Sequence, residues 1–516
     1  MPARSRSHCR ASRLMADPLS ANPRRRATVR ELVLVYLMAV VAFGYFAGTW
    51  GDGNTNSRLA LVKAIAEEHR FTIDTTQIDR EWAPFRTDDR STYQGHYYSD
   101  KAMGSSLVAA LAWAPAHAVL RAAGVPDSPR TFKVLATFVG SSLACALMAP
   151  LVFAFVTGRS GPRTAAWVTA AIVFGTPVFR YSTGLYGHVL AGLLCMGAFV
   201  IWYEAHRRSR LSLPRTFVSG LLLGFMIVTE YPTALLALIL GFYILYVLHA
   251  QGRLSDWRPY GVMAAGFVLA LTPLLYYNLQ VYGDPFTTGY QHHATARFAA
   301  AHAHGIAGIG WPDPVVLFAT TLHPFMGIFW QSPVLLLAIA GWVSARETVD
   351  RAAAWCSLAA ISAYIVLLSG YYEWSGGMSY TPRHLIPVYP LFAIPLAFLP
   401  ARWLPAALAL TGVSIVQHTI AVTARWEYLV RLIQQTLDEQ GHPTAFFVST
   451  IWNACWRNLQ AGLFVTNRGS LVLPVGYVSL VPLLILEGAL CFALLRASAA
   501  RSAPAVGAEK PSWAGH

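Results

Sequence analysis

The sequence predicts an all-α fold, a polytopic transmembrane bundle of about 11 to 13 helices. Two bulk observations support this prediction. Hydrophobic residues make up 55% of the 516 residues and charged residues only 12%, whereas soluble domains average about 25% charged residues. Apolar runs also recur along the chain, and many approach the roughly 20 residues that a spanning helix needs. These observations exclude a soluble globular protein.

The apolar runs give the expected helices in order. They lie near 32–49, 102–120, 134–157, 164–179, 184–204, 216–231, 232–250, 260–281, 314–344 (with a break), 353–370, 384–400, 403–423 and 473–496. The first run follows a basic segment, as the core of a signal peptide does. It is long and lacks a clear small-residue cleavage site, so we expect a retained helix.

The positive charge of the chain indicates membrane orientation rather than nucleic-acid binding. The net charge is +14. Basic clusters beside membrane spans mark the cytoplasmic side, and aromatic residues that would stack on bases are not interleaved with this cluster. The arginines before the first run are Arg4, Arg6, Arg10, Arg13, Arg24, Arg25, Arg26 and Arg30. We therefore expect a disordered basic cytoplasmic tail over 1–31 and no nucleic-acid partner.

The same rule orients the rest of the chain. The arginine-containing segments expected in the cytoplasm are 205–215, 251–258, 345–352 and the tail 497–516. The segments expected outside are 50–100, 282–313, 371–383 and the loop 424–472. Residues 32–423 then form one membrane-embedded unit, and 473–496 forms the last transmembrane helix. Both termini are expected in the cytoplasm.

One count conflicts with this topology. Four apolar runs separate the outside segment 50–100 from the cytoplasmic segment 205–215. An odd number of crossings is required, so one run must be re-entrant or interfacial. The sequence leaves 102–120 and 164–179 open as that run.

The first outside segment, 50–100, is too polar for a plain linker, with nine acidic and six basic residues. Residues Ser57–His69 have helical spacing of apolar positions, which predicts a short amphipathic helix on the membrane surface. The cysteines predict no zinc site, because no CxxC or His/Cys spacing is present. The sequence also lacks a Walker loop, a GxGxxG turn and an HExxH motif, so a nucleotide-driven enzyme is not supported.

The first polar element on the expected outer side follows the first apolar run directly. Asp52 lies there between two glycines, at the boundary between water and lipid. A carboxylate in such a place suits general-base chemistry. The alternative is a solvated turn in which Asp52 and Asn54 serve as turn or cap residues. Asp89 and Asp100 are further acids of the same segment.

The second element ends in Ser99, Asp100 and Lys101, just before an apolar run. A lysine at a helix N-terminus favours an anion such as phosphate, because the helix dipole and free N–H groups act with the ammonium. The alternative, compatible with the first, is that Ser99 or Asp100 is a helix N-cap. Lys101 is one of only four lysines in the chain.

Two later elements complete the candidates. His188 follows Tyr181–Gly187 between two apolar runs, and a lone histidine of this kind is also often structural. Arg383 begins an apolar run and can clamp a phosphate through its planar fork. The side chains expected to contact a sugar or acceptor are Tyr372, Glu373, Trp374 and Glu230. Aromatic residues also belong at membrane interfaces for structural reasons alone.

Taken together, these motifs resemble bacterial membrane glycosyltransferases of the GT-C superfamily, in the phospholipid-carrier-dependent, protein-mannosyltransferase-like group. The resemblance covers about residues 32–400, and the order of the motifs is more specific than any one of them. The matching pieces are Asn54–Leu59, Ile73–Asp74, Gly95–Lys101, Gly175–Pro177, Tyr181–Thr183, Gly187–His188, Thr229–Pro232, Gly327–Phe329, Ser332–Pro333, Trp374–Gly377 and Pro382–Arg383.

This resemblance implies a GT-C-like helix bundle and an activity. A sugar on a polyprenyl phosphate is transferred directly, with inversion, to an acceptor on the outer face of the bacterial cytoplasmic membrane. The resemblance places an acidic catalytic residue in the first outside loop, which assigns the base role to Asp52, with Asp89 and Asp100 in reserve. Lys101 and Arg383, with Arg58 or His188, are then expected to hold the lipid phosphate.

Three points stay open at the sequence level. The sugar and the acceptor are not readable, although the loop 424–472 is expected to contact the acceptor. A divalent cation, Mg²⁺ or Mn²⁺, is conceivable if Asp52 and Asp100 share it, but no cofactor is certain. The competing reading is a lipid-linked saccharide flippase, which also explains many helices and polar residues at one face.

Overall fold

The structure, a computed structural model, describes residues 26–49, 51–323, 326–377, 379–423 and 467–500. The helices and strands in chain order are α1 (Val29–Phe46), α2 (Gly53–Ala66), α3 (Asp74–Ile78), η1 (Ala83–Phe85), β1 (Arg90–Tyr93), β2 (His96–Ser99), α4 (Gly104–Ala122), α5 (Pro129–Thr137), η2 (Phe138–Ser142), α6 (Leu143–Ala146), α7 (Met148–Ser160), α8 (Pro162–Val173), α9 (Val178–Tyr181), α10 (His188–Arg208), α11 (Leu213–Thr229), η3 (Tyr231–Thr233), α12 (Ala234–Ala250), α13 (Trp257–Tyr282), η4 (Gly289–His292), α14 (Ala296–Ala303), α15 (Pro314–Thr321), α16 (Ile328–Gln331), η5 (Pro333–Leu337), α17 (Ala338–Ala345), α18 (Arg351–Ser369), η6 (Arg383–Phe392), α19 (Ala393–Leu396), η7 (Ala401–Trp403), α20 (Leu404–Thr423), η8 (Arg468–Leu471), η9 (Tyr477–Leu480) and α23 (Val481–Ala500).

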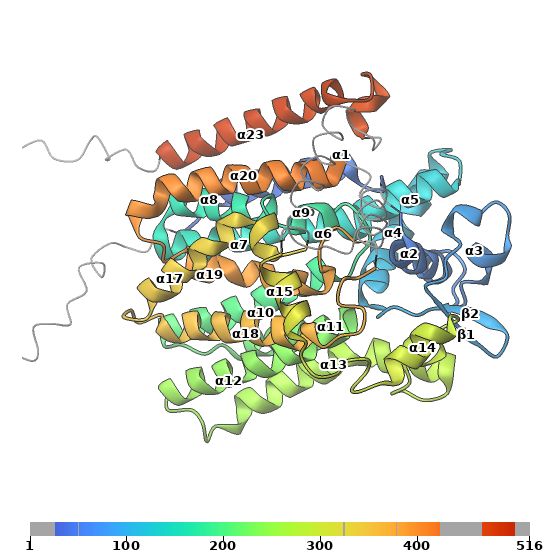
Figure 1. The fold of residues 1–516 in the computed structure, drawn as a ribbon, viewed down its shortest axis with the longest axis horizontal. Coiled ribbons are helices and arrows are strands. Elements are labelled where there is room, and N and C mark those ends of the chain that lie inside the picture. The colour runs from blue at the N-terminus through green and yellow to red at the C-terminus, as the bar shows by residue number, and fades with distance from the viewer. Residues whose placement is uncertain (1–25, 50, 324–325, 378, 424–466, 501–516) are drawn as a thin grey trace, which may run out of the picture.

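The long helices run along the longest dimension of the molecule, and the short elements gather at one end (Figure 1). We call the end with α2, α3, α14 and the β1–β2 hairpin the loop end. We call the opposite end, where α1 begins and α23 ends, the tail end. At the tail end Ser498 Oγ donates to Glu31 Oε1 at 3.1 Å. Toward the loop end Tyr45 hydrogen-bonds the carbonyl of Ser479, so α1 and α23 are antiparallel neighbours.

The prediction of a polytopic helical membrane protein is confirmed. In the described part of the chain, eight helices are long and apolar enough to cross a membrane. They are Val29–Phe46, Pro129–Ser160, His188–Arg208, Tyr231–Ala250, Trp257–Tyr282, Arg351–Ser369, Ala401–Thr423 and Tyr477–Ala499. Two shorter apolar helices, Leu213–Thr229 and Pro333–Ala345, pack among them.

Several predicted runs are interrupted rather than continuous, and proline is the recurring reason. The run 384–400 forms the 3-10 segment η6, which contains Pro387 and Pro390, and then the four-residue α19. Proline has no N–H to donate and collides with the preceding turn, so a regular α-helix cannot pass through the segment. The run 314–344 similarly divides into α15, α16, η5 and α17.

The structure bears on the crossing count that the sequence left open. α4 covers the run 102–120, is not among the candidate spans, and packs against α2 at the loop end (Figure 1). The other run, 164–179, contains α8, which has only 12 residues. At about 1.5 Å per residue this helix is about 18 Å long, shorter than the roughly 30 Å hydrocarbon core of a bilayer. Of the two runs left open, 102–120 is the one that lies at the loop end.

The helix predicted over Ser57–His69 is present as α2, but its predicted place on the membrane surface is wrong. Protein covers both of its sides. Leu59 and Val62 belong to one buried cluster, while Ala60 and Leu61 belong to another. The apolar positions that predicted an interfacial face therefore form two packing faces, and α2 lies inside the loop end.

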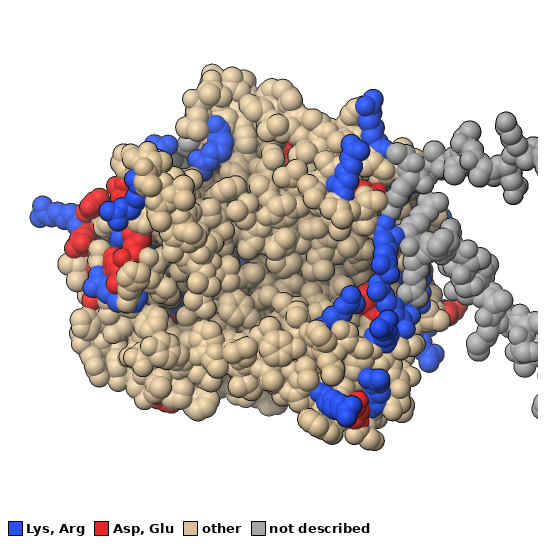
Figure 2. Space-filling model, turned by 180° about the vertical axis from the view of Figure 1, so that it is seen from behind, with Lys and Arg blue, Asp and Glu red and all other residues tan. Residues whose placement is uncertain are grey.

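Basic side chains collect at the tail end. Figure 2 shows lysine and arginine side chains around that end, whereas the loop end carries acidic and basic side chains together. Inside the tail end, Asp350 lies 2.9 Å from Arg159 Nε and 3.5 Å from Arg207 Nη1. This contact ties the ends of α7 and α10 to the start of α18. The predicted tail segments 1–25 and 501–516, and the loop residues 424–466, lie outside the described residues.

Candidate active site at the loop end

Asp52 is fixed by the helix that it begins. It is the N-cap of α2, and its Oδ1 accepts the N–H of Thr55 at 2.8 Å, while Thr55 Oγ1 accepts the N–H of Asp52 at 3.0 Å. A capping box of this kind satisfies free N–H groups at a helix start. Asp52 thus serves as a helix cap, as the alternative prediction proposed. Because capping uses Oδ1, the other carboxylate oxygen, Oδ2, remains for other partners.

Two side chains from distant parts of the chain converge on that second oxygen. Tyr186 Oη donates to Asp52 Oδ2 at 2.8 Å, and Arg383 Nη1 lies 3.3 Å from the same oxygen. Burial and the nearby Asp52 charge raise the pKa of Tyr186 well above its ordinary value, so its phenol keeps its proton. The Asp52 side chain nevertheless remains 29% exposed.

The β1–β2 hairpin places the two reserve acids side by side. Gln94 and Gly95 have φ of 49° and 84°, as a two-residue primed turn requires. Arg90 pairs with Ser99 in this register, so Asp89 before β1 and Asp100 after β2 lie next to each other. Both carboxylates then reach the following residue, Lys101.

Lys101 is held between these two acids. Its Nζ lies 2.8 Å from Asp100 Oδ2 and 3.0 Å from Asp89 Oδ2. Burial alone would lower the pKa of Lys101, but Asp100 and Asp89 outweigh it and hold the pKa above the ordinary value. Burial alone would raise the pKa of Asp89, but Lys101 and Arg383 hold that pKa below its ordinary value. Lys101 and Asp89 therefore carry their charges at neutral pH, in a tight ion-pair cluster that also contains the Asp100 carboxyl group.

The two acids differ in access to solvent. Asp100 is sealed, with a side-chain exposure of 0%, and also accepts from Ser57 Oγ at 3.2 Å. Asp89 keeps 28% exposure and borders an open depression lined also by Gly53, Arg86 and Thr87. The capping alternative for this element is wrong, because α4 begins after Met103 and no side chain caps it.

Arg58, Glu230 and His188 form a third buried group. Arg58 donates from Nε to Asn54 at 3.0 Å, from Nη1 to Ala102 and Ser105 at 2.9 and 2.6 Å, and from Nη2 to Glu230 Oε1 at 2.8 Å. His188 Nδ1 lies 3.2 Å from the same oxygen of Glu230. Four of the five N–H groups of Arg58 thus have a protein acceptor in the described residues, so most of its donors are engaged within the protein.

The three groups lie close together because α2 connects them. Its cap, Asp52, precedes Gly53, where an added Cβ would lie 3.0 Å from Asp89 Cγ. Ser57 on α2 bonds Asp100, and the next residue, Arg58, binds Glu230. The first two turns of this helix therefore place acids and cations from four chain segments at one end of the bundle.

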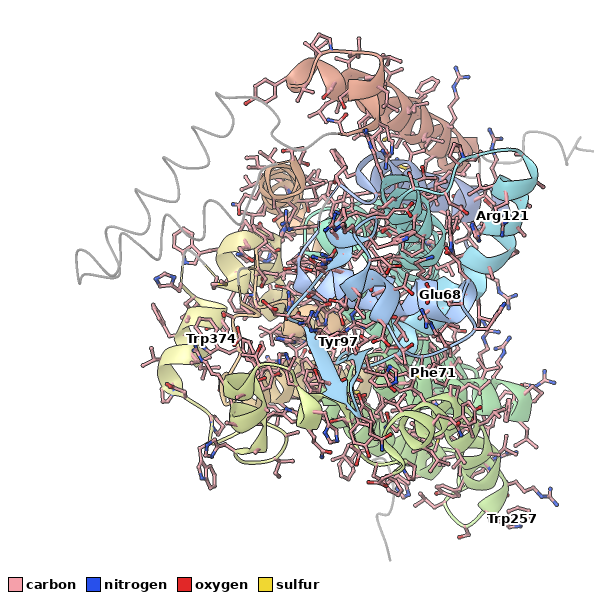
Figure 3. The ribbon with its side chains drawn as sticks, turned by 90° about the vertical axis from the view of Figure 1, so that its right-hand side faces the viewer. Glu68, Phe71, Tyr97, Arg121, Trp257 and Trp374 are labelled. Carbon is pink, nitrogen blue, oxygen red and sulfur yellow. The ribbon has the colours of Figure 1, made fainter. Side chains whose placement is uncertain are left out.

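The residues predicted to stack on a sugar are less closely engaged. Figure 3 views the loop end and labels Trp374, which is half-buried like Tyr372 and Glu373. In the described residues, no hydrogen bond or ion pair joins the side chains of Glu373 or Trp374 to the acids and cations above. Tyr372 packs on Tyr371 with ring centroids 4.8 Å apart. Tyr371 in turn packs on His384, the residue that follows Arg383.

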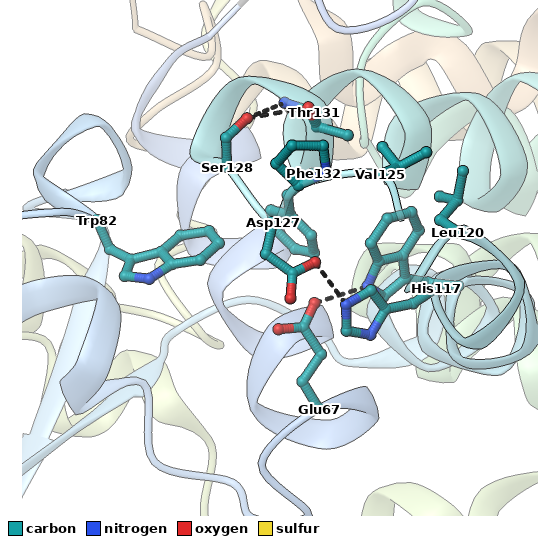
Figure 4. A pocket seen from close by; sticks show the side chains of 11 residues that line it. Glu67, Trp82, His117, Leu120, Val125, Asp127, Ser128, Thr131 and Phe132 are labelled. Atoms are coloured by element: carbon teal, nitrogen blue, oxygen red, sulfur yellow. Dashed lines mark hydrogen bonds and ion pairs between the residues drawn. The ribbon is translucent and has the colours of Figure 1, made fainter. Parts of the chain in front are cut away.

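A separate small pocket lies between α2, α4 and α5 and contains none of the predicted site residues (Figure 4). Four of the lining side chains pair with one another: Trp113 Nε1 donates to Glu67 Oε1 at 2.8 Å, and His117 Nε2 lies 2.8 Å from Asp127 Oδ1. These contacts hold the connection between α4 and α5 against α2, which is a packing role.

The predicted sharing of a divalent cation by Asp52 and Asp100 does not fit the residues. The carboxylate of Asp52 faces Arg383 and Tyr186, while that of Asp100 is sealed against Lys101 and Ser57. Within the described ranges, no three His, Cys, Asp or Glu side chains group as metal ligands.

Sequence reasoning gave no role to Tyr186 or His384. Tyr186 is 134 positions from Asp52, and only the tertiary fold shows their contact. The His384 ring lies 5.3 Å from the His188 ring and 5.2 Å from the Tyr371 ring, between centroids. The one sequence feature that could have identified both residues is their position in polar, aromatic segments between apolar runs.

The chain is similar to ArnT from Cupriavidus metallidurans bound to undecaprenyl phosphate, with 14% sequence identity and a TM-score of 0.45 over 92% of this chain and 78% of that chain. No family model matches the sequence, and no curated protein matches it. The residues of this chain therefore carry the functional argument.

Proposed function

We propose that this protein is a membrane glycosyltransferase that moves a sugar from a polyprenyl-phosphate-linked donor to an acceptor hydroxyl. The observation that carries this proposal is the environment of Asp52. Its carboxylate is partly exposed, is oriented by the Thr55 N–H and Tyr186, and lies beside the buried guanidinium of Arg383. A base next to a fixed cation, at one end of a membrane bundle, suits an amphiphilic donor with a phosphate leaving group.

The proposed reaction is a single displacement. Asp52 takes the proton of the acceptor hydroxyl while the acceptor oxygen forms a bond to the anomeric carbon. The bond between that carbon and the phosphate oxygen breaks, and the electron pair leaves with the polyprenyl phosphate. Attack opposite the leaving group inverts the anomeric centre. Asp52, Arg383 and Lys101 act by position and charge, since they are held in place before the substrate binds.

Arg383 is well placed to serve the leaving phosphate as well as Asp52. The distance of 3.3 Å between Nη1 and Asp52 Oδ2 exceeds the roughly 2.7–2.9 Å of a strong charge-assisted bond. Its buried Nε has no hydrogen-bond partner in the described residues. The guanidinium therefore retains donors for a phosphate oxygen. Lys101 adds a second fixed positive charge nearby.

The proposal prefers Asp52 because each of the two other acids has a property that is unfavourable for a general base. Asp100 is sealed from solvent and pairs with Lys101. Asp89 is exposed, but Lys101 and Arg383 lower its pKa, which makes it a weaker base. In the proposal Asp89 and Asp100 hold Lys101 in place.

The orientation follows from charge. The arginine-rich tail end is proposed to face the cytoplasm and the loop end the outer side of the bacterial cytoplasmic membrane. Sugar transfer then occurs in the cell envelope, and both termini are cytoplasmic. The acceptor is unidentified. Contact between the acceptor and the loop 424–472 remains a prediction that largely concerns residues outside those described.

The test is sugar release, with water as the acceptor, from a panel of polyprenyl-phosphate hexoses and pentoses by the purified protein in detergent, with and without EDTA. The proposal expects turnover of at least one donor, inverted configuration in the product by NMR, and no dependence on EDTA. Retained configuration would refute the single displacement. The absence of turnover with every donor, together with movement of the saccharide lipid across liposomes, would establish the flippase reading instead.

A further inference from the structure

Several buried nitrogen atoms at the loop end have no hydrogen-bond partner in the described part of the chain, and three of them lie close to the candidate site. These three are His188 Nε2, Arg383 Nε and His384 Nε2. His188 is 2% exposed, and its ring lies 5.3 Å from that of His384. Buried polar groups in folded proteins nearly always have partners, because an unpaired one destabilises the fold. A ligand atom is a physical reason for leaving His188 Nε2 unpaired.

The contact with Glu230 determines which kind of ligand atom His188 can bind. A carboxylate only accepts, so the Nδ1 atom that lies 3.2 Å from Glu230 Oε1 carries the hydrogen. Arg58 Nη2 already lies 2.8 Å from the same oxygen, so the Glu230 charge has a cationic partner. Arg383, next to His384 in sequence, adds another positive charge to this region. Burial of the His188 ring, together with these positive charges, favours the neutral imidazole, whose Nε2 carries a lone pair and accepts.

The backbone is shaped to allow this contact. A Cβ at Gly187 would lie 2.2 Å from Glu230 Oε1 and 2.7 Å from the Thr229 carbonyl oxygen. Only a residue without a side chain permits that approach. The orientation of the His188 ring is therefore set by Glu230 from one side, which directs Nε2 away from Glu230.

An acceptor nitrogen needs a donor, and the two parts of the proposed substrate differ in this respect. The oxygens of a sugar phosphodiester are deprotonated at neutral pH and only accept. A sugar hydroxyl can donate. The aromatic rings near His188 also suit a sugar. The His384 ring packs on Tyr371 and the Tyr371 ring packs on Tyr372, with centroid separations of 5.2 and 4.8 Å. Apolar ring walls with a few placed polar atoms are usual in small-molecule sites.

We propose that His188 Nε2 accepts a hydrogen bond from a hydroxyl of the donor sugar, and that Glu230 is the positioning residue that fixes the imidazole. This inference rests on the proposed function and assigns His188 to the sugar instead of the phosphate. It defines the substrate class as polyprenyl-phosphate sugars that keep one particular hydroxyl free.

The test uses the active donor with single hydroxyls removed or O-methylated, one at a time, and sugar release as the readout. For wild type, loss of one hydroxyl should lower kcat/KM about tenfold or more, because it leaves a buried acceptor unpaired. His188→Asn keeps an N–H toward Glu230 but removes the Nε2 acceptor. His188→Gln keeps an acceptor near the Nε2 position but loses the contact with Glu230.

The outcomes are distinct. His188→Asn should turn over the parent donor more slowly and no longer distinguish it from the critical deoxy donor, whereas His188→Gln should still distinguish them. Equal kcat/KM for all analogues in wild type, or full discrimination in His188→Asn, overturns the assignment and leaves the proposed function intact. If His188→Asn does not fold, the wild-type panel and His188→Gln decide alone. No release from any donor by wild type overturns both proposals.

Discussion

The two ends of the bundle each contain buried ion pairs, but they expose opposite partners. At the tail end the carboxylate of Asp350 is fully buried, whereas Arg159 and Arg207 keep side-chain exposures of 20% and 26%. At the loop end Asp52 and Asp89 keep 29% and 28%, whereas Arg383 and Lys101 keep only 11% and 9%. The tail end thus seals its acid, whereas the loop end seals its cations and leaves Asp52 and Asp89 partly exposed, although Asp100, the other partner of Lys101, is sealed as well.

This difference separates a structural ion pair from a candidate active site. A sealed carboxylate between two exposed guanidinium groups can join helix ends, but it cannot take a proton from a substrate. A partly exposed carboxylate beside sealed cations can take a proton, and the cations can stabilise a leaving anion. The presence of an ion pair therefore does not indicate a function. What distinguishes the two ends is which partner of the pair, the acid or the cation, is exposed to solvent.

Removal of the sealed guanidinium at the loop end should have the largest effect on turnover. We expect Arg383→Ala to lower kcat by about 100-fold or more, since a fixed donor to the developing charge is lost. Arg383→Lys should recover part of the loss. Arg346→Ala is the matched control, because Arg346 is exposed at the tail end, and it should retain wild-type turnover in the same sugar-release assay. Equal turnover by Arg383→Ala and Arg346→Ala would contradict the account.

Removal of the sealed acid at the tail end should affect stability instead. Asp350→Asn leaves two arginines without their carboxylate, and we expect the free energy of unfolding to fall by roughly 3 kcal/mol. Turnover per folded molecule should stay unchanged. Glu347→Gln controls for loss of an exposed acid in the same loop, at 79% exposure. Thermal unfolding in detergent checks both variants, and a selective loss of turnover in Asp350→Asn would remove the contrast between the ends.

Overpacking beside Glu230 should have a smaller, local effect. In Gly187→Ala the new methyl group would collide with Glu230 Oε1, and we expect a loss of about 1–3 kcal/mol in stability together with lower turnover. Gly241 on α12 has no atom within 4 Å of an added Cβ, so Gly241→Ala should be neutral or slightly stabilising. Thermal unfolding and sugar release of the two variants compare them directly, and identical behaviour would mean that Glu230 moves freely.

The pH dependence of the Asp89–Lys101 pair should be flat near neutrality. The pKa of Asp89 is lowered, so its stabilising contribution is complete above its unfolded value of about 3.9 and is lost as pH falls through the folded value. The pKa of Lys101 is raised, so its contribution is complete below about 10.4 and is lost as pH rises through the folded value. The carboxyl ¹³C chemical shift of Asp89 in the wild-type protein, followed by NMR, should thus be constant from about pH 5 to pH 9. A drift within that range would contradict the pairing.

Composition and charge predict the membrane bundle well, because the energetic cost of polar groups in lipid acts on every residue of a span. The interruption of the run 384–400 was not predicted, although Pro387 and Pro390, which cause it, stand in the sequence. The burial of α2 was not readable. In the sequence, the apolar positions of α2 resemble a single membrane-facing surface. In the structure, α4 packs on one side of this helix and the segment around Ile73 on the other.

The candidate site shows the same limit. Asp52, Lys101 and Arg383 could be singled out because charged residues bordering apolar runs need a reason. Their pairing could not, because Arg383 is 331 positions from Asp52 and no spacing rule connects them. Arg58 and Glu230, predicted as ligand contacts, bind each other across 172 positions. Tertiary contacts decide which charged side chains pair with each other and which remain available to a ligand. Such contacts leave no periodic pattern in a single sequence.

The most direct test of the central claim compares Asp52→Asn with Asp89→Asn in one sugar-release assay, with thermal unfolding to confirm folding of both. The two acids have nearly equal exposure and lie against the same residue, Gly53, so each controls for the other. If Asp52 is the base, Asp52→Asn should lose about 1,000-fold in kcat, and Asp89→Asn should retain a substantial fraction of wild-type turnover. A folded Asp52→Asn that keeps its turnover, with collapse in Asp89→Asn, would contradict the account and assign the base to Asp89.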